Sequence, residues 1–343
     1  MCFARLFSLV IFIQATVAGA FEVEDRVLYE AQREATILRV ISTADKEAFE
    51  PIILAFQEQN PTITVDYTIT GTTDLMLAIS EEEVAFDLAI SSAMDLQTKL
   101  ANDGFAASYP SAAAAALPEW ANWREQVFAF TQEPAVLVVS DAFFSDTPPP
   151  TNREELISIL RENPERFRGR IGTYDVRRSG FGYLMATQDS RSSEAFWRLM
   201  EVMGRLDAQL YCCSGDMIRD VANGELALAY NVLGSYAASQ KDRIEGFQII
   251  ELEDYVNVML RTALIPANAA NPDDARKLID FLVDLRLRPD LVSATGLPGI
   301  DASSFENDAS LQPIRLGPGL LVFLDQLRRE RFLKSWENSI VQQ

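Results

Sequence analysis

LRVISTADKEAFEPIILAFQEQNP, residues 38–61, predicts a β-strand followed by an amphipathic helix. An apolar run of strand length opens it, and Ser42 and Thr43 follow as acceptors for the free N–H groups of a helix start. Pro51 removes one helix hydrogen bond, so we expect a late start or a kink there. Such a joint between strand and helix exposes a concave edge that suits anions. The helix carries the apolar spacing of a face that lies on a sheet, through Phe49, Ile52, Ile53 and Phe56.

The same pattern of strand, hydroxyl pair and helix occurs twice more, over residues 63–83 and 86–102. Three such units in succession predict a parallel sheet with right-handed crossovers. Ser and Thr cap helices in every α/β protein, so a single pair says little about function. Three pairs at one carboxyl-end edge favour a binding site. Its predicted members are Ser42, Thr43, Thr72, Thr73, Ser91 and Ser92.

Length and charge limit the possible functions. A chain of 343 residues is long for one core, which favours two lobes or domains. The formal net charge is −20, from 30 basic and 50 acidic residues. Nucleic acid is excluded as a main partner, because phosphate binding needs clustered Lys and Arg. No glycine-rich phosphate loop occurs either, so nucleotide binding has no support.

The sequence contains no histidine and only three cysteines. Histidine-based catalytic triads and metal sites are therefore excluded. The cysteines are Cys2 and the adjacent pair Cys212 and Cys213. Because a disulfide between neighbours is strained, we expect the pair to be two free thiols.

The N-terminus predicts export. Arg5 is followed by the apolar run Leu6–Ile13 and by the small residues Ala18-Gly19-Ala20. This order is typical of a cleavable signal peptide over residues 1–20. The apolar run is too short to span a bilayer comfortably, so we expect a soluble, exported, periplasmic protein.

A long apolar passage near the middle of the chain contains a proline. Pro134 argues against one central strand and for a chain that changes sheets, with Glu133 at the junction. A second lobe then follows, and alternating strands over residues 247–264 return to the first lobe. The whole predicts two α/β lobes with two crossings between them.

The order of these elements resembles the bacterial periplasmic solute-binding proteins of ABC transporters, in the extracellular solute-binding group with ferric-iron and phosphoglycerate-type binders. No single motif is specific, and the resemblance depends on an ordered set that runs through most of the chain. Its members are Phe49-Glu50-Pro51, Ala55-Phe56, Asn60-Pro61, Gly71-Thr72-Thr73-Asp74-Leu75, Phe86-Asp87-Leu88, FAFTQEPAVLVVS at 128–140, RIGTYD at 170–175, SGFGYL at 179–184, Asn223-Gly224-Glu225, Tyr230 and NPDDARKLIDFLVD at 271–284.

The resemblance implies a two-lobed periplasmic-binding-protein fold of type II. Mixed sheets flanked by helices would enclose a central ligand cleft, with two hinge crossings. Lobe 1 would comprise residues 37–132 and 256–343, and lobe 2 residues 133–255. A monomer without a cofactor is expected.

The resemblance also implies where a ligand would bind. The hydroxyl groups named above would contribute from the first lobe. Arg177 or Arg178 could neutralise an anionic ligand, although a solvated turn is an equal alternative for this pair. The crossover and the second lobe would add Thr131, Glu133, Ser179, Gly180, Tyr183, Ser214, Tyr230 and Asn231.

Ferric-iron members of the family use adjacent tyrosines after the Gly-Glu strand. Here Tyr230 and Tyr236 are separated, and histidine is absent. Tyr230, Tyr236 and Glu133 could still bind Fe(III) together with an anion. We rank this alternative below an organic anion.

Three functions remain open from the sequence. The first is a periplasmic receptor for a small anionic metabolite, phosphorylated or polycarboxylic, that delivers it to an ABC permease in the inner membrane. The second is a regulator that senses a ligand and contacts a membrane histidine kinase. The third, an enzyme using Glu133 or Asp175, is the weakest, since no nucleophile–base spacing or metal cluster is present.

Overall fold

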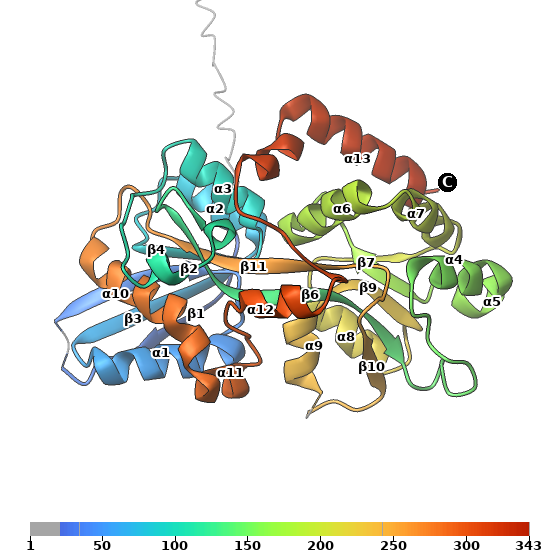
Figure 1. Cartoon of the computed structure of the whole chain (residues 1–343), viewed down its shortest axis with the longest axis horizontal. Coiled ribbons are helices and arrows are strands. Elements are labelled where there is room, and N and C mark those ends of the chain that lie inside the picture. Colours follow the sequence, from blue (N-terminus) through green and yellow to red (C-terminus); the bar gives the residue numbers. More distant parts are fainter. Residues whose placement is uncertain (1–20, 34, 242, 343) are drawn as a thin grey trace, which may run out of the picture.

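The computed structural model describes residues 21–33, 35–241 and 243–342. The predicted signal peptide, residues 1–20, lies outside this part of the chain. Figure 1 shows two α/β lobes side by side, connected by the long strands β6 and β11. The two-lobed α/β prediction is confirmed. Among the described residues, no helix is both long and apolar enough to cross a membrane.

The first lobe is built on the three predicted units of strand and helix. Strand β2 lies between β3 and β4 and is parallel to both, as the sequence predicts. Pro51 lies inside α1 without ending it. The units are β2 (Thr36–Ser42) with α1 (Lys46–Gln59), β3 (Ile63–Thr70) with α2 (Thr72–Ser80), and β4 (Leu88–Ser91) with α3 (Met94–Asn102).

An additional strand precedes these units. β1 (Val23–Tyr29) pairs antiparallel with β3 at the edge of the sheet. The charged stretch Val23–Tyr29 is therefore extended. This strand places Glu22 and Glu24 beside the carboxyl end of β3, where Val23 pairs with Thr70.

β6 (Val127–Ser140) connects the lobes as one continuous strand. Residues 128–134 pair with β11 (Val256–Leu264), and from Ala135 onward the partner is β9 (Leu228–Leu233). The predicted change of sheets at Pro134 is thus confirmed, although the strand is not interrupted. Proline is tolerated because it lies where one partner strand gives way to the next, so no regular ladder depends on its nitrogen.

The second lobe continues the sheet in the order β6-β9-β7-β8, with β10 paired to β6. Residues 251–255 then form the second crossing, back to β11. The second-lobe elements are α4 (Arg153–Glu162), α5 (Pro164–Phe167), β7 (Ile171–Tyr174), α6 (Gly180–Ser192), α7 (Ala195–Arg205), β8 (Gln209–Tyr211), α8 (Ser214–Ala222), α9 (Gly234–Gln240) and β10 (Phe247–Ile250). Three short elements before β6 belong to the first lobe: η1 (Ala114–Ala116), η2 (Glu119–Ala121) and β5 (Asn122–Trp123), which pairs with the first-lobe part of β6.

The chain end corrects the predicted lobe boundary. Residues 256–343 were assigned to lobe 1, but α13 (Gln326–Ile340) packs on α7 of lobe 2, as Figure 1 shows. Phe332, Trp336 and Ile340 are buried in the core of that lobe. The remaining elements after β11 are α10 (Pro272–Val283), η3 (Asp284–Leu287), α11 (Pro289–Thr295), α12 (Ala302–Asn307), β12 (Leu311–Pro313) and η4 (Pro318–Phe323).

Candidate functional site

A cavity of about 480 Å³ lies between the lobes. Its lining comes from the joints of strand and helix in both lobes and from β1 and β11. This volume is typical of a site for a small molecule. The lining residues are Glu22, Glu24, Thr43, Asp45, Thr70, Gly71, Thr72, Asp74, Ser92, Tyr174, Arg178, Ser179, Phe181, Cys212, Cys213, Ser214, Gly215, Asp216, Leu233, Tyr236 and Arg261.

The first helices of lobe 1 begin at this cavity without side-chain caps in the described structure. Their N-cap residues are Asp45 for α1, Gly71 for α2 and Ala93 for α3. The sequence predicted Ser and Thr at these caps, and that detail is wrong. The free N–H groups of several helix starts make this edge favourable for an anion.

The hydroxyl groups of lobe 1 divide into two sets. Thr43 and Ser92 border the cavity, and Thr43 Oγ1 accepts the backbone N–H of Ser92 at 3.1 Å. Ser42 and Ser91 are buried behind them. Ser42 Oγ accepts the Tyr67 hydroxyl at 2.7 Å and the backbone N–H of Ala44 at 3.0 Å, so it shapes the turn and does not reach the cavity.

Lobe 2 contributes the starts of α6 and α8. Ser179 is the N-cap of α6, accepting the Gly182 N–H at 3.1 Å, as the sequence predicts for a helix start here. Ser214, the first residue of α8, is hydrogen-bonded to the Tyr174 hydroxyl and accepts the Leu233 N–H at 3.3 Å. Two helix starts from lobe 2 therefore face those of lobe 1.

Arg261 on β11 is the buried cation at the base of the cavity. Its Nε and Nη2 atoms donate to the two Glu133 carboxylate oxygens at 2.9 and 3.0 Å, and neither side chain is exposed. Thr131 Oγ1 also donates to Glu133 at 2.6 Å, and Ser235 donates to its other oxygen. Arg261 Nη1 has no hydrogen-bond partner among the described residues. Arg261 therefore borders the cavity and has one guanidinium nitrogen that no described residue accepts from.

The guanidinium group of Arg261 carries its positive charge in the folded protein. Burial acts to lower the pKa of its guanidinium, but the facing Glu133 and Tyr236 raise it above its ordinary value. The side chain is therefore protonated at every physiological pH.

Hydrogen bonds across the cleft hold the lobes together on both sides of the cavity. Thr72 Oγ1 accepts the Gly180 N–H at 2.8 Å, and Thr73 Oγ1 donates to the Arg178 carbonyl at 3.2 Å. The Tyr236 hydroxyl accepts the Asp45 N–H at 3.1 Å. These three hydrogen bonds join the two lobes directly across the cleft.

The structure brings only part of the predicted site together. Five predicted residues border the cavity: Thr43, Thr72, Ser92, Ser179 and Ser214. Thr131 and Glu133 are buried and reach it only through Arg261. A separate cavity of about 310 Å³ between α2, α3 and α6 is bordered by Thr73, Arg177, Gly180 and Tyr183.

Tyr230 and Asn231 are not at the cleft. The Tyr230 hydroxyl donates to buried Asp189 at 2.8 Å and accepts from Arg153 at 2.7 Å, and Asn231 donates to the same aspartate at 2.7 Å. Strand β9 directs both side chains toward a polar network inside lobe 2. Arg177 also faces elsewhere, since it pairs with Asp175 at 2.6 Å and with Glu337 at 3.5 Å.

The alternative iron ligands are not brought together. Tyr236 borders the cavity, whereas Tyr230 lies in lobe 2 and Glu133 is occupied by Arg261. Burial raises the pKa of Tyr236, which disfavours the phenolate that Fe(III) requires.

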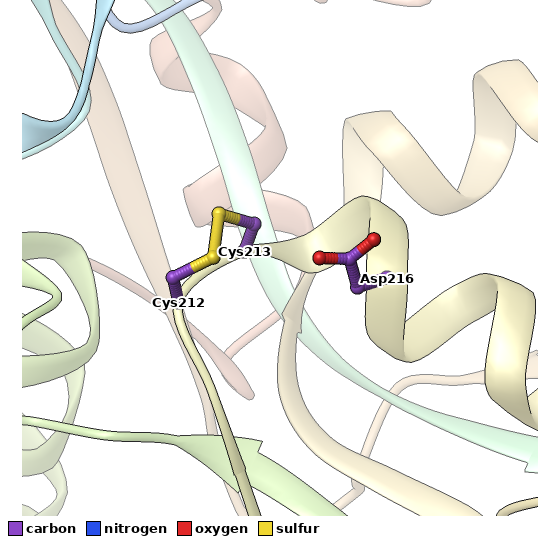
Figure 2. A group of neighbouring side chains, drawn as sticks. All are labelled: Cys212, Cys213 and Asp216. Carbon is purple, nitrogen blue, oxygen red and sulfur yellow. A yellow bond between two sulfur atoms is a disulfide. The ribbon is translucent and has the colours of Figure 1, made fainter. Parts of the chain in front are cut away.

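Cys212 and Cys213 form a disulfide, which corrects the expectation of two free thiols. The bridge joins neighbours whose Cα atoms are 3.8 Å apart, the spacing of an ordinary trans peptide. Figure 2 shows the bridge beside Asp216, with which it borders the cavity. Because the sulfur atoms bond to each other, they are not thiolates, and these three residues are not a metal site in this state.

Sequence reasoning missed the charged residues of the site. A sequence signal for Arg261 exists, because it is a cation within the mostly apolar strand NVMLRTALI, residues 257–265. Arg178 was considered only as an alternative to Arg177. Glu22, Glu24, Asp45 and Asp74 carried no signal, because acidic residues are common throughout this chain.

Two helix N-cap residues, one at the cavity and one away from it, allow a matched pair of substitutions. Ser179 caps α6 at the cavity, and Asn152 caps α4 away from it, accepting the Glu155 N–H at 2.9 Å. Ser179→Ala and Asn152→Ala should each lower the free energy of unfolding by about 1 kcal/mol. Only Ser179→Ala should also weaken ligand binding, by roughly three- to tenfold, because it removes one hydroxyl from the lining. Urea titration and calorimetry measure the two effects, and equal ligand affinity in both variants would contradict the assignment.

A buried carboxyl in α3 predicts a pH dependence of stability. Asp95 is 3% exposed, and its Oδ1 has no hydrogen-bond partner among the described residues. Burial raises its pKa from 3.8 to about 7. The native state then binds a proton that the unfolded state has lost, so stability should fall as the pH rises from about 4 to about 7.

Asp95→Asn should remove this fall and should be more stable than the wild type above pH 7. Urea unfolding at a series of pH values measures the effect, with the exposed Asp141→Asn as the control. An unchanged pH profile in Asp95→Asn would show that this carboxyl is ionised in the native state.

Comparisons with known proteins agree with this arrangement. The family model described as bacterial extracellular solute-binding protein matches residues 38–287. A search of curated protein sequences finds no significant match. The substrate-binding protein of an ABC transporter from Agrobacterium tumefaciens is similar in structure, with a TM-score of 0.89 and 33% identity over 94% of this chain and 100% of that chain.

More distant structures share the fold alone. The periplasmic binding protein AfuA from Actinobacillus pleuropneumoniae, with fructose-6-phosphate bound, has a TM-score of 0.72 and 14% identity over 89% of this chain and 98% of its own. Iron-bound HitA from Pseudomonas aeruginosa has a TM-score of 0.67 and 16% identity over 89% of this chain and 99% of its own.

Proposed function

Because this chain belongs to the bacterial extracellular solute-binding protein family, homologous to ABC transporter substrate-binding proteins, we propose that it captures a small solute with an anionic group. The family is a class of non-catalytic binding proteins, and we assign no reaction to the cleft. The solute would bind between the lobes and stabilise their closed arrangement, since it contacts both only in that state.

The observation that carries this proposal is that Nη1 of Arg261 has no hydrogen-bond partner in the part of the chain that the structure describes. A buried guanidinium nitrogen without a partner is costly unless a ligand satisfies it. The same cavity is bordered by the helix starts at Thr72, Ser92, Ser179 and Ser214. A carboxylate or phosphate group would accept from the guanidinium, the hydroxyls and the backbone N–H groups together.

Membership of the family supports a proposal for the partner and the location. Substrate-binding proteins of ABC transporters work with an inner-membrane permease, and we propose that this chain delivers its solute as a monomer to one. The structural relatives are binding proteins of transporters, which favours a permease over a sensor kinase. We also propose export to the periplasm with cleavage after Ala20. N-terminal sequencing of the exported protein should begin at Phe21, and retention of residues 1–20 would contradict cleavage.

A thermal-shift screen tests the anion site. The compounds are phosphate, phosphonates, phosphoglycerates, amino acids, di- and tricarboxylates, Fe(III) citrate and polyamines. A ligand at a hundred times its dissociation constant should stabilise the folded state by about 2.7 kcal/mol. We expect shifts among compounds with a carboxylate or phosphate group. Shifts with Fe(III) citrate but not with citrate, or with polyamines alone, would contradict the proposal.

A further inference from the structure

The cavity carries more negative than positive charge. Five carboxylates border it: Glu22, Glu24, Asp45, Asp74 and Asp216. Only two guanidinium groups do so, and one of them, Arg261, is already paired with Glu133. A purely anionic ligand would satisfy Arg261 but would meet the excess of carboxylates at close range, which is unfavourable.

Four of these carboxylates lie together on lobe 1 without a cation. Within residues 21–33, 35–241 and 243–342, no Lys or Arg lies within 4.0 Å of the carboxylates of Glu22, Glu24, Asp45 or Asp74. Burial, then Asp45, Glu22 and Asp74, raise the pKa of Glu24. Burial also raises the pKa of Asp45, against the opposing effect of Arg261. The group is therefore under mutual repulsion that a bound cation would relieve.

The spacing of these carboxylates favours an organic cation over a metal ion. In the described residues, the only set of potential metal ligands within 4.8 Å of one another is Cys212, Cys213 and Asp216. The four carboxylates of lobe 1 are spread along β1 and the starts of α1 and α2. A protonated amine or a guanidinium group can contact carboxylates at such spacing, whereas a metal ion requires converging oxygens.

Arg261 is the residue of the same cavity that favours an anionic group in the ligand. It is fully buried and borders the same cavity, and none of the residues that the structure describes accepts a hydrogen bond from its Nη1. We propose that the solute is zwitterionic, with its carboxylate or phosphate held by Arg261 and its protonated amine or guanidinium held among Glu24, Asp45 and Asp74. This inference rests on the proposed function and narrows its substrate class, from anions in general to anions that also carry a cationic group.

Matched pairs of compounds test the inference. O-phosphoethanolamine is compared with ethyl phosphate, and ω-amino acids with different spacer lengths are compared with the corresponding fatty acids. Diaminoalkanes of the same lengths provide the cationic group alone. Isothermal titration calorimetry measures the affinity of each compound for the wild-type protein. We expect a zwitterion to bind at least about tenfold more tightly than its matched anion.

Substitutions locate the cationic group. Glu24→Gln and Asp74→Asn should each weaken the best zwitterion by about fivefold or more and should leave its matched anion unaffected or strengthened. Both variants should be at least as stable as the wild type, because each removes repulsion. Glu47→Gln, on α1 but outside the cavity lining, is the control and should not change binding.

The outcomes separate this inference from the proposed function. Equal or tighter binding of the matched anions, with no effect of Glu24→Gln, would overturn the zwitterion and leave the anion site standing. Binding of diaminoalkanes as tight as that of zwitterions would overturn the anion site itself. No binding by any zwitterion at any spacer length would reject the inference.

Discussion

Arg261→Met is expected to lower the free energy of unfolding by about 3–5 kcal/mol, because it leaves the carboxylate of Glu133 buried without its partner. Glu133 has no exposed side-chain surface and receives two guanidinium donors and two hydroxyls. The hydroxyls of Thr131 and Ser235 cannot neutralise its charge. Chemical denaturation of the purified variant measures the loss.

The double variant Glu133→Gln/Arg261→Met should regain most of that stability. It removes both charges together, and replacing a whole buried pair is often neutral where breaking it is costly. Arg198→Met, which breaks the exposed pair with Glu154, is the control and should have little effect. A double variant as unstable as Arg261→Met would show that the loss arises from packing and not from the uncompensated charge.

The second large effect concerns the ligand. In the folded double variant Glu133→Gln/Arg261→Met, affinity for the best ligand of the wild-type protein should fall by at least about 30-fold. Removing a buried charged donor from an anion leaves that anion unpaired in the cleft, which typically costs 2–5 kcal/mol, so the drop should be at least of this size. Calorimetry compares the variant with the wild type.

The double variant is the informative background because it separates ligand affinity from folding. Arg198→Met again provides the control, since it lies outside the cavity lining. Retention of wild-type affinity in the double variant would place the anionic group of the ligand away from Arg261.

The first-lobe architecture was predictable because its signals are local. Each strand, turn and helix of residues 38–102 is specified by neighbouring residues, and the parallel sheet follows from the repetition of the unit. The change of sheets at Pro134 was likewise predictable, because proline cannot donate a hydrogen bond within a regular central ladder and so marks a change of partner strand.

Other features depend on contacts between distant residues. The position of α13 on α7 is determined by packing of Phe332, Trp336 and Ile340, and an apolar face alone does not say which lobe it covers. Ser42 and Thr43 illustrate the same limit within the site. Both follow the same strand, but only Thr43 borders the cavity, because Ser42 points inward to Tyr67.

The charged part of the site could not be predicted for a further reason. A buried ion pair between Glu133 and Arg261 joins residues 128 positions apart, and nothing local marks them as partners. Glu22 and Glu24 reach the cavity only because β1 pairs with β3. The Cys212–Cys213 bridge was not predicted either, because the general argument about strain favours two free thiols and the two sulfur atoms are bonded in the structure.

The binding of an anionic group at Arg261 can be tested by a crystal structure of the protein with the best ligand from the thermal-shift screen. We expect the ligand between the lobes, with a carboxylate or phosphate oxygen about 2.7–3.2 Å from Nη1 of Arg261. We also expect contacts from Thr72, Ser92 and Ser179, which border the cavity. A ligand bound outside this cleft, or one whose anionic group lies away from Arg261, would contradict this expectation.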